Sequence, residues 1–175
     1  MGVNILGRFP HRRMRRNRSD EFSRRLIREN RLSVDDLIYP VFLFEGKNKT
    51  QTIESMPGVM RYTPDLILKI AEQCVALSIP AIALFPVIDQ ELKTPLAEGA
   101  YSEQGLVPRV VASLKRNFPE LGVITDVALD PYTSHGQDGL LDEAGYVLND
   151  ETVEVLIQQA LCQAAAGVDV LAPSD

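Results

Sequence analysis

Short apolar runs alternate with longer amphipathic stretches along most of this chain. Four runs are apolar over nearly their whole length, contain β-branched or aromatic residues, and recur about every 40 to 46 residues. Such runs are typical of strands that are buried on both faces of a parallel sheet. We therefore predict strands at residues 37–45, 81–87, 122–130 and 168–175.

The stretches between these runs predict helices. Pro64 after Thr63 is a favourable first helical residue, Pro108 opens a second helix within residues 107–118, and Asp150 caps a third that ends at Gly167. The inward face of the first helix is expected to consist of Leu66, Ile67, Ile70, Val75 and Leu77.

Two further elements are expected outside this alternation. The polar stretch 46–63, with turn residues at Pro57 and Gly58, predicts a small hairpin. Near the N-terminus, Ser19 is a candidate cap for a helix over residues 20–30, with Phe22 and Leu26 on one apolar stripe.

Strands joined by helices at this spacing indicate right-handed βαβ units around a parallel sheet, which is either doubly wound or part of a barrel. No GxGxxG or Walker-type loop follows any strand, which weakens the nucleotide-binding sheet. Polar residues instead gather at the carboxyl ends of strands, where barrel active sites lie: Asp126, Asp130, Ser174 and Asp175. The pattern favours an α/β fold, a TIM-type (β/α)8 barrel of which this chain supplies about the first four βα units.

The 175 residues fit half of such a barrel. A half barrel exposes two sheet edges and an apolar face, so we expect a fragment or a chain that needs a partner. The expected organisation is an N-terminal basic arm with a short helix at residues 1–32, followed by a truncated first half of the barrel at residues 33–175.

The net charge of −6 is unevenly distributed. Residues 8–31 hold ten arginines and three acids, whereas the rest holds eight basic and 21 acidic residues. A basic arm before an acidic body is compatible with nucleic-acid binding or with docking on an acidic subunit surface. The acidic body favours docking, and the arm lacks the interleaved aromatic residues of single-strand binders. We expect a homo-oligomer assembled through the arm and no nucleic-acid partner.

Composition also indicates the compartment. No apolar run approaches the roughly 20 residues needed to cross a bilayer, and the N-terminus lacks the apolar core of a secretory signal. We therefore expect a cytoplasmic protein without a membrane partner. The two cysteines, Cys74 and Cys162, fall in apolar helical patterns, which favours free thiols over a disulfide.

Residues 126–139, DVALDPYTSHGQDG, concentrate the candidate chemistry. Ideal strand alternation places Asp126, Ala128 and Asp130 on one inward face, and the turn-prone residues that follow allow Asp138 to fold back towards them. Converging carboxylates can bind a hard cation or perform acid and base catalysis, and a structural loop is an equally open interpretation. For His135, a structural hydrogen bond is at least as plausible as a catalytic role.

Several motifs in the same order resemble one enzyme family. The run TDVALDPYTSHGQDG, with RMRRN, DLIYPVFLFEG, SMPGV, ALFPV, GYVLND and the terminal APSD, is similar to porphobilinogen synthase, also called 5-aminolevulinate dehydratase. The resemblance covers the chain from about residue 12. It implies a hydro-lyase that condenses two 5-aminolevulinate molecules to porphobilinogen in heme and porphyrin biosynthesis. It also implies a barrel with an arm that embraces a neighbouring subunit, usually in a homo-octamer.

The resemblance also assigns site residues. Asp126 matches an aspartate associated with proton handling and the substrate amine, Ser174 matches a serine near the substrate-binding lysine, and both are expected to be catalytic. Asp130 and Asp138 are expected to contact substrate or metal. Zinc-dependent members carry cysteines at the positions of Ala128, Asp130 and Asp138, and these residues cannot form a thiolate zinc site. The resemblance therefore implies a zinc-independent member with allosteric magnesium, whose ligands lie mostly outside this chain.

The family forms Schiff bases with its substrate on lysines that come later than the position matching Asp175. The five lysines present, at positions 47, 49, 69, 93 and 115, do not lie at strand ends. We therefore expect the 175-residue chain to be inactive by itself. Two alternatives remain: another Schiff-base barrel enzyme of the aldolase type, or an assembly module that acts through its arm.

Overall fold

The computed structural model describes residues 7, 9, 10, 12, 13 and 15–175. Contacts within the chain define two units, Met1–Ser33 and Val34–Asp175. The boundary lies one residue beyond the one expected from the composition.

The first unit contains two short helices, α1 (Arg16–Ser19) and α2 (Glu21–Leu26). The prediction of one helix capped by Ser19 is wrong, because Asp20 adopts an extended backbone between the two helices. The Ser19 hydroxyl donates to the Arg16 carbonyl oxygen at 2.9 Å instead of accepting from a following amide. Phe22 and Leu26 are 67% and 80% exposed, so this unit by itself does not bury its apolar stripe.

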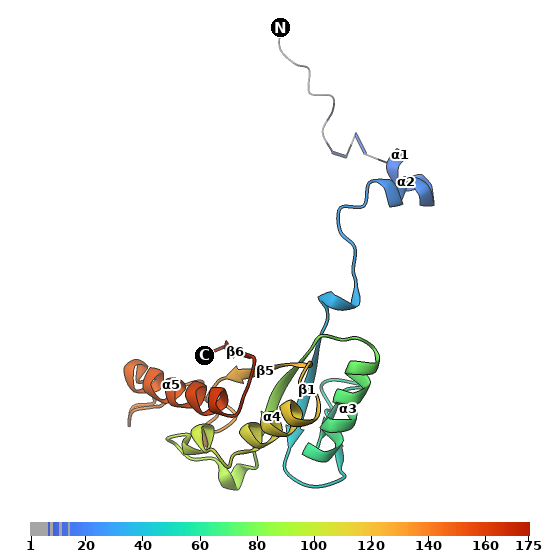
Figure 1. Cartoon of the computed structure of the whole chain (residues 1–175). Coiled ribbons are helices and arrows are strands. Elements are labelled where there is room, and N and C mark those ends of the chain that lie inside the picture. The colour runs from blue at the N-terminus through green and yellow to red at the C-terminus, as the bar shows by residue number, and fades with distance from the viewer. Residues whose placement is uncertain (1–6, 8, 11, 14) are drawn as a thin grey trace. The chain divides into compact units, whose positions relative to one another are not determined.

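The second unit is built on a six-stranded sheet with the order β2-β3-β1-β4-β5-β6. Strands β1, β5 and β6 of this sheet are labelled in Figure 1. Strands β1, β4, β5 and β6 run parallel, as the spacing of the apolar runs predicts. The expected hairpin is present, since β2 and β3 pair antiparallel. The strands are β1 (Ile38–Phe44), β2 (Thr50–Thr52), β3 (Met60–Tyr62), β4 (Ala81–Val87), β5 (Gly122–Val127) and β6 (Val170–Pro173).

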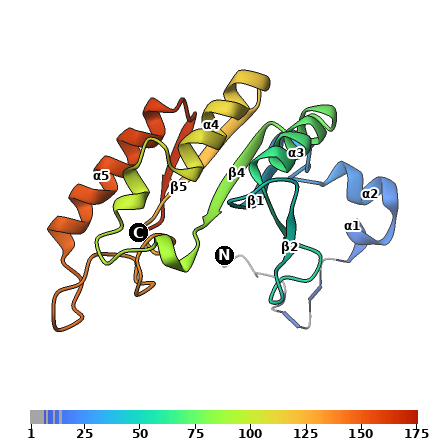
Figure 2. The same ribbon diagram turned by 90° about the horizontal axis from the view of Figure 1, so that it is seen from below.

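Three helices lie side by side along one face of this sheet (Figure 2). They are α3 (Pro64–Ala76), α4 (Leu106–Asn117) and α5 (Asn149–Ala165). Short 3₁₀ turns complete the unit at η1 (Val34–Asp36), η2 (Gln90–Leu92) and η3 (Glu98–Tyr101). The parallel strands with a helix in each crossover confirm the predicted α/β class.

The main core lies between the sheet and helices α3 and α4. Alternate strand residues such as Leu43, Leu84 and Val123 are fully buried towards the helices. On the other face, the rings of Phe42 and Phe85 pack with centroids 5.7 Å apart and remain partly exposed. The helix-covered face is therefore packed within this chain, whereas the other face remains partly exposed.

The helices differ from the sequence predictions in three details. On α3, Ile67 and Ile70 are buried as expected, but Val75 and Leu77 are 44% and 65% exposed, because Ala71 and Cys74 occupy the inward positions. Pro108 is the third residue of α4 and not its first.

The third predicted helix also starts earlier than expected. Asp150 lies inside the first turn of α5, whose capping position is Leu148, and its carboxylate accepts from the Asn149 side chain at 3.0 Å. Gly167 ends the helix as predicted, with a φ of +96° that favours glycine.

Strand β5 is shorter than predicted and ends at Val127. Ala128 and Asp130 therefore lie beyond the strand, Ala128 is 2% exposed, and Asp130 is exposed. Strand alternation therefore does not extend to Ala128 and Asp130, although the charge of Asp126 still acts on the Asp130 carboxyl. A turn, and not a strand, sets the position of Asp130.

Both cysteines are free, with Cys74 buried on α3 and Cys162 partly buried on α5. Among the described residues, the helices are all too short or too polar to cross a bilayer.

Candidate functional site

The carboxyl ends of β5 and β6 bring Asp126 and Ser174 together. Asp126 is the penultimate residue of β5 and lies opposite Ala172 of β6, and Ser174 directly follows that strand. The Ser174 hydroxyl donates to Asp126 Oδ1 at 2.6 Å. One carboxylate oxygen is thus fixed, and Asp126 has a second oxygen with which it can accept a proton or a hydrogen bond.

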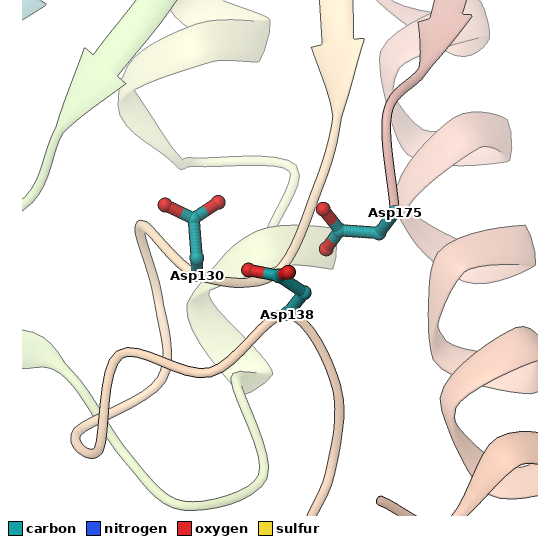
Figure 3. Close-up of side chains that lie close together, drawn as sticks. All are labelled: Asp130, Asp138 and Asp175. Atoms are coloured by element: carbon teal, nitrogen blue, oxygen red, sulfur yellow. The ribbon is translucent and has the colours of Figure 1, made fainter.

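Three other carboxylates gather beside this pair: Asp130, Asp138 and Asp175 (Figure 3). Each offers one oxygen, and these oxygens all lie within 4.8 Å of one another. Asp130 and Asp138 come from the segment after β5, and Asp175 follows β6. The fold thus brings Asp138 back to Asp130, as the turn-prone sequence between them allows.

The environment of this cluster raises the pKa of two of its members. Partial loss of solvent raises the pKa of the Asp130 carboxyl, and the charges of Asp138 and Asp126 raise it further, whereas the Lys93 ammonium opposes the shift. The pKa of Asp175 is also raised, first by loss of solvent and then by the neighbouring carboxylates, against the hydrogen bond from the Leu129 amide. Carboxyl groups with raised pKa values are better proton donors near neutral pH.

The loop after β4 holds the loop after β5 in place. The Thr94 amide donates to the Tyr132 carbonyl at 3.1 Å, and the Ser134 amide donates to the Thr94 carbonyl at 3.0 Å. Beneath these bonds, Leu129 and Tyr132 are buried in a second apolar cluster with Ala97 and Ala100 of the β4 loop. Asp130 therefore stands between two anchored residues, although it lies in a loop.

His135 and Ser134 make local structural contacts. The ring Nδ1 of His135 accepts from the Gln137 amide at 3.2 Å, and the Ser134 carbonyl accepts from the side chain of Gln90 at 3.2 Å. Both residues are exposed. The hydrogen bond from the Gln137 amide is a structural contact of His135, which is one of the two roles that the sequence left open.

The sequence prediction missed a member of the cluster and the groups that support it. Asp175 was recognised only as polar at a strand end, although its carboxylate accepts from the Leu129 amide at 2.6 Å. Gln159 and Gln163 are buried on α5 and donate to carbonyl groups at the end of β5. Their spacing of four residues, with Thr152 on the same face, was the available signal. Lys93 was missed because it lies six residues beyond β4.

The lysines show no arrangement suited to covalent catalysis. Lys115 of α4 is engaged with Asp169 at 2.8 Å and with the Leu121 carbonyl at 3.2 Å. Lys47 and Lys49 lie in the β1–β2 connection, Lys69 on the exposed side of α3, and Lys93 just after η2. Lys93 is the lysine whose charge acts on the acidic cluster.

The residues present suit magnesium and do not suit a thiolate zinc site. A thiolate zinc site does not fit, because Ala128 has no donor atom and both cysteines lie on helices. Carboxylate oxygens from Asp130, Asp138 and Asp175 are ligands that hard cations such as Mg²⁺ prefer.

Comparison with protein families places the chain among known proteins. The family model described as delta-aminolevulinic acid dehydratase matches residues 11–175. A delta-aminolevulinic acid dehydratase of Bradyrhizobium diazoefficiens is 53% identical over 163 residues, which cover 93% of this chain and 46% of that protein. The chloroplastic protein of the same name from Glycine max is 42% identical and covers all of this chain, with 43% of its own length matched.

A solved structure shares the fold. The delta-aminolevulinic acid dehydratase (porphobilinogen synthase) of Toxoplasma gondii, in complex with the reaction product porphobilinogen, superposes with a TM-score of 0.88 at 42% identity. The match covers 94% of this chain and 47% of that one. The chain thus spans about half the length of the relatives it matches, and these matches favour the dehydratase interpretation over the aldolase and assembly-module alternatives.

Proposed function

The chain belongs to the delta-aminolevulinic acid dehydratase family, and from this membership we propose that it supplies one wall of a porphobilinogen synthase active site. The reaction is the condensation of two 5-aminolevulinate molecules to porphobilinogen, a hydro-lyase step of heme and porphyrin biosynthesis. The observation that carries the proposal is the Ser174–Asp126 pair beside three carboxylates at the strand ends.

This wall suits the amino end of the substrate. 5-Aminolevulinate carries an ammonium group, which an anionic Asp126 attracts and orients through the oxygen that Ser174 does not occupy. Building the pyrrole requires removal of protons from carbon and nitrogen and release of water, so groups that both accept and donate protons are needed. Asp126, assisted by Ser174, is the proposed proton acceptor. Asp130 is the proposed substrate contact, and Asp138 lies beside it.

The covalent part of the mechanism is not proposed for this segment. The family resemblance implies that Schiff-base lysines come later than the position matching Asp175, and the five lysines here lie on loops and helices. We therefore expect the 175-residue chain alone to form no porphobilinogen from 5-aminolevulinate. The comparison is the protein expressed from its complete reading frame, assayed at equal concentration.

The decisive substitution is Asp126→Asn in the complete protein. Loss of the proton acceptor with retention of shape is expected to lower kcat by about 10²-fold or more. Glu143→Gln, an exposed acid outside the cluster, is the matched control. Full activity of Asp126→Asn would contradict the assigned role, and product formation by the 175-residue chain would contradict the need for later lysines.

A hard cation is proposed at Asp130 and Asp138, with Asp175 as the third oxygen ligand. Magnesium bound there would supply positive charge to orient the substrate and to offset carboxylate repulsion. The family resemblance assigns magnesium an allosteric role with ligands mostly outside this chain, so two sites must be distinguished. Titration of the 175-residue chain with Mg²⁺ should detect the local site, and Asp138→Asn should abolish it. Zinc dependence is expected to be absent.

The basic arm is proposed to hold a homo-oligomer, an octamer in the family pattern. Its arginines and the exposed apolar side chains of α2 suit an acidic, partly apolar subunit surface. Deletion of residues 1–18 is expected to lower the oligomer mass measured by sedimentation without abolishing the fold of the second unit. We further propose a cytoplasmic location for the protein, with no nucleic-acid or membrane partner.

A further inference from the structure

Helix α5 turns two glutamines towards the sheet. Gln159 and Gln163 are each 1% exposed, one helical turn apart, on the side of α5 that packs against β5. Gln163 Nε2 donates to the Asp126 carbonyl at 3.1 Å, and its Oε1 accepts from the Thr125 hydroxyl at 2.7 Å. Gln159 Nε2 donates to the Ala128 carbonyl at 3.0 Å.

These bonds begin where the pairing of β5 with β4 stops. The last pair of that ladder is Leu84 with Thr125, one residue before Asp126. A buried carbonyl group without a donor costs about 1 to 3 kcal/mol. The two glutamine amides therefore replace a strand as the donors to the Asp126 and Ala128 carbonyls.

The same short segment is also held by two residues that follow β6. Ser174 fixes the Asp126 carboxylate, and the Asp175 carboxylate accepts from the Leu129 amide. Residues 126–129 thus lie between two glutamines on α5 and two polar residues after β6. The positions of the Asp126 carboxylate and of Asp130, which follows this segment, depend on both sets of bonds.

Gln159 brings a cost in stability as well as a gain. Its Oε1 is buried and, among the described residues, accepts no hydrogen bond. An apolar side chain of similar length at this position would avoid that cost but would leave the Ala128 carbonyl without its donor. A residue whose gain and cost in stability offset each other is typical of a position where a site has to be shaped.

We propose that Gln159 and Gln163 are positioning residues that fix the Asp126 and Asp130 carboxylates through the main chain at the end of β5. This inference rests on the proposed function for its catalytic readout. Neither glutamine needs to touch substrate, because each acts through a carbonyl group of the segment that carries the acids.

The first test compares Gln159→Met and Gln163→Met with Gln158→Met in the protein expressed from its complete reading frame. Methionine keeps the length of the side chain and removes its hydrogen bonds, and Gln158 is exposed on the same helix. A displacement of catalytic groups by about 1 Å can lower the rate about 100-fold. We expect each buried variant to lose about tenfold or more in kcat per folded molecule, with a much smaller change in KM, and Gln158→Met to be unchanged.

A second variant remains informative if the methionine variants fold poorly. In Gln163→Glu, the ionised carboxylate accepts from Thr125 but cannot donate to the Asp126 carbonyl, whereas the protonated carboxyl can. Burial raises the pKa of a carboxyl group, so activity relative to the native protein should fall as the pH rises through about 6 to 8. A loss of activity that is independent of pH and follows the folded fraction would overturn the proposal.

A readout without catalysis separates this inference from the proposed function. In the 175-residue chain, Gln163→Met should shift the carboxyl-carbon NMR resonance of Asp126, and Gln159→Met should speed hydrogen exchange of the Leu129 amide. Gln158→Met should do neither. If the native complete protein forms no porphobilinogen, the proposed function fails, and these two measurements still decide the positioning role. Unchanged resonance and exchange in the folded variants would overturn it.

Discussion

Helices α4 and α5 lie side by side on one face of the sheet, but their buried residues differ in kind. The buried residues of α4 are all apolar: Leu106, Val107, Pro108, Val110, Val111 and Leu114. The buried residues of α5 are Thr152, Gln159 and Gln163, and its apolar Val153, Ile157 and Leu161 are 45 to 65% exposed. The contrast separates a helix that stabilises the fold from one whose inward face supports the end of β5.

The outward face of α5 adds to this contrast. Val153, Ile157 and Leu161 are spaced four residues apart and form one apolar stripe. Neighbouring β6 is an edge strand of the described sheet, and its Val170 is 49% exposed. Apolar surface arranged in this way is typical of an interface, in agreement with the expectation that this half barrel needs a partner.

The largest expected effect is a difference in the free energy of unfolding between two leucine substitutions, one on each helix. Leu114→Ala on α4 removes a fully buried side chain and should lower the free energy of unfolding by about 2 to 5 kcal/mol. Leu161→Ala on α5 removes a side chain that is 65% exposed and should change it by less than about 0.5 kcal/mol. Urea denaturation of both variants measures the difference, and equal losses would contradict the contrast between the helices.

A smaller effect is expected at the polar contact between α5 and the sheet. Thr125→Val removes the donor to Gln163 Oε1 and leaves a buried acceptor unpaired, so unfolding should become easier by about 1 to 3 kcal/mol. Thr52→Val on the exposed strand β2 is the matched control and should be close to neutral. A neutral result for Thr125→Val would show that the glutamine contact contributes little to the fold.

Removing a charge from the acidic cluster should raise the stability of the fold, whereas the two preceding substitutions should lower it. Because the pKa values of Asp130 and Asp175 are raised in the folded chain, the folded state holds more protons than the unfolded state between the ordinary and the raised values. Stability should therefore decrease as the pH rises through that window and recover on acidification. Asp138→Asn should raise stability at neutral pH by less than about 1 kcal/mol, since the cluster is exposed to solvent.

Thermal unfolding followed between pH 4 and 8 tests this prediction. The pH dependence should be flatter in Asp138→Asn than in the native chain. Glu143→Gln should leave it unchanged, because this residue lies outside the cluster. A steeper pH dependence in Asp138→Asn would contradict the charge repulsion on which the prediction rests.

The smallest effect on stability, but a clear one on association, is expected for Ile157→Lys combined with Leu161→Lys. Both side chains are already exposed, so the free energy of unfolding should change by less than about 0.5 kcal/mol each. Self-association of the 175-residue chain, measured by sedimentation, should decrease. Equivalent lysine substitutions at exposed Glu154 and Gln158 of the same helix are the control.

The alternation of apolar runs and amphipathic stretches was sufficient to predict the four parallel strands, the hairpin and the helices between them. Nearly continuous apolar runs are typical of strands in parallel sheets and can be recognised along the chain, although in this chain only the helix-covered face of the sheet is buried. The inward face of α5 could not be predicted in this way. Its partners are carbonyl groups of β5, which become acceptors only once the ladder with β4 has ended at Thr125.

The same distinction between local pattern and tertiary contact applies to the candidate site. By itself, the sequence determined that Asp126, Asp130 and Ser174 lie near strand ends, that the turn-prone residues before Asp138 allow it to fold back, and that the Ala128 side chain cannot bind zinc. These statements follow from residue type and chain position. Only the tertiary structure paired Ser174 with Asp126, brought Asp175 to Asp130, and turned Gln159 and Gln163 inward. Those contacts join residues 31 to 48 positions apart. Contacts at this range depend on how the strands pair and where the pairing stops, which local pattern does not specify.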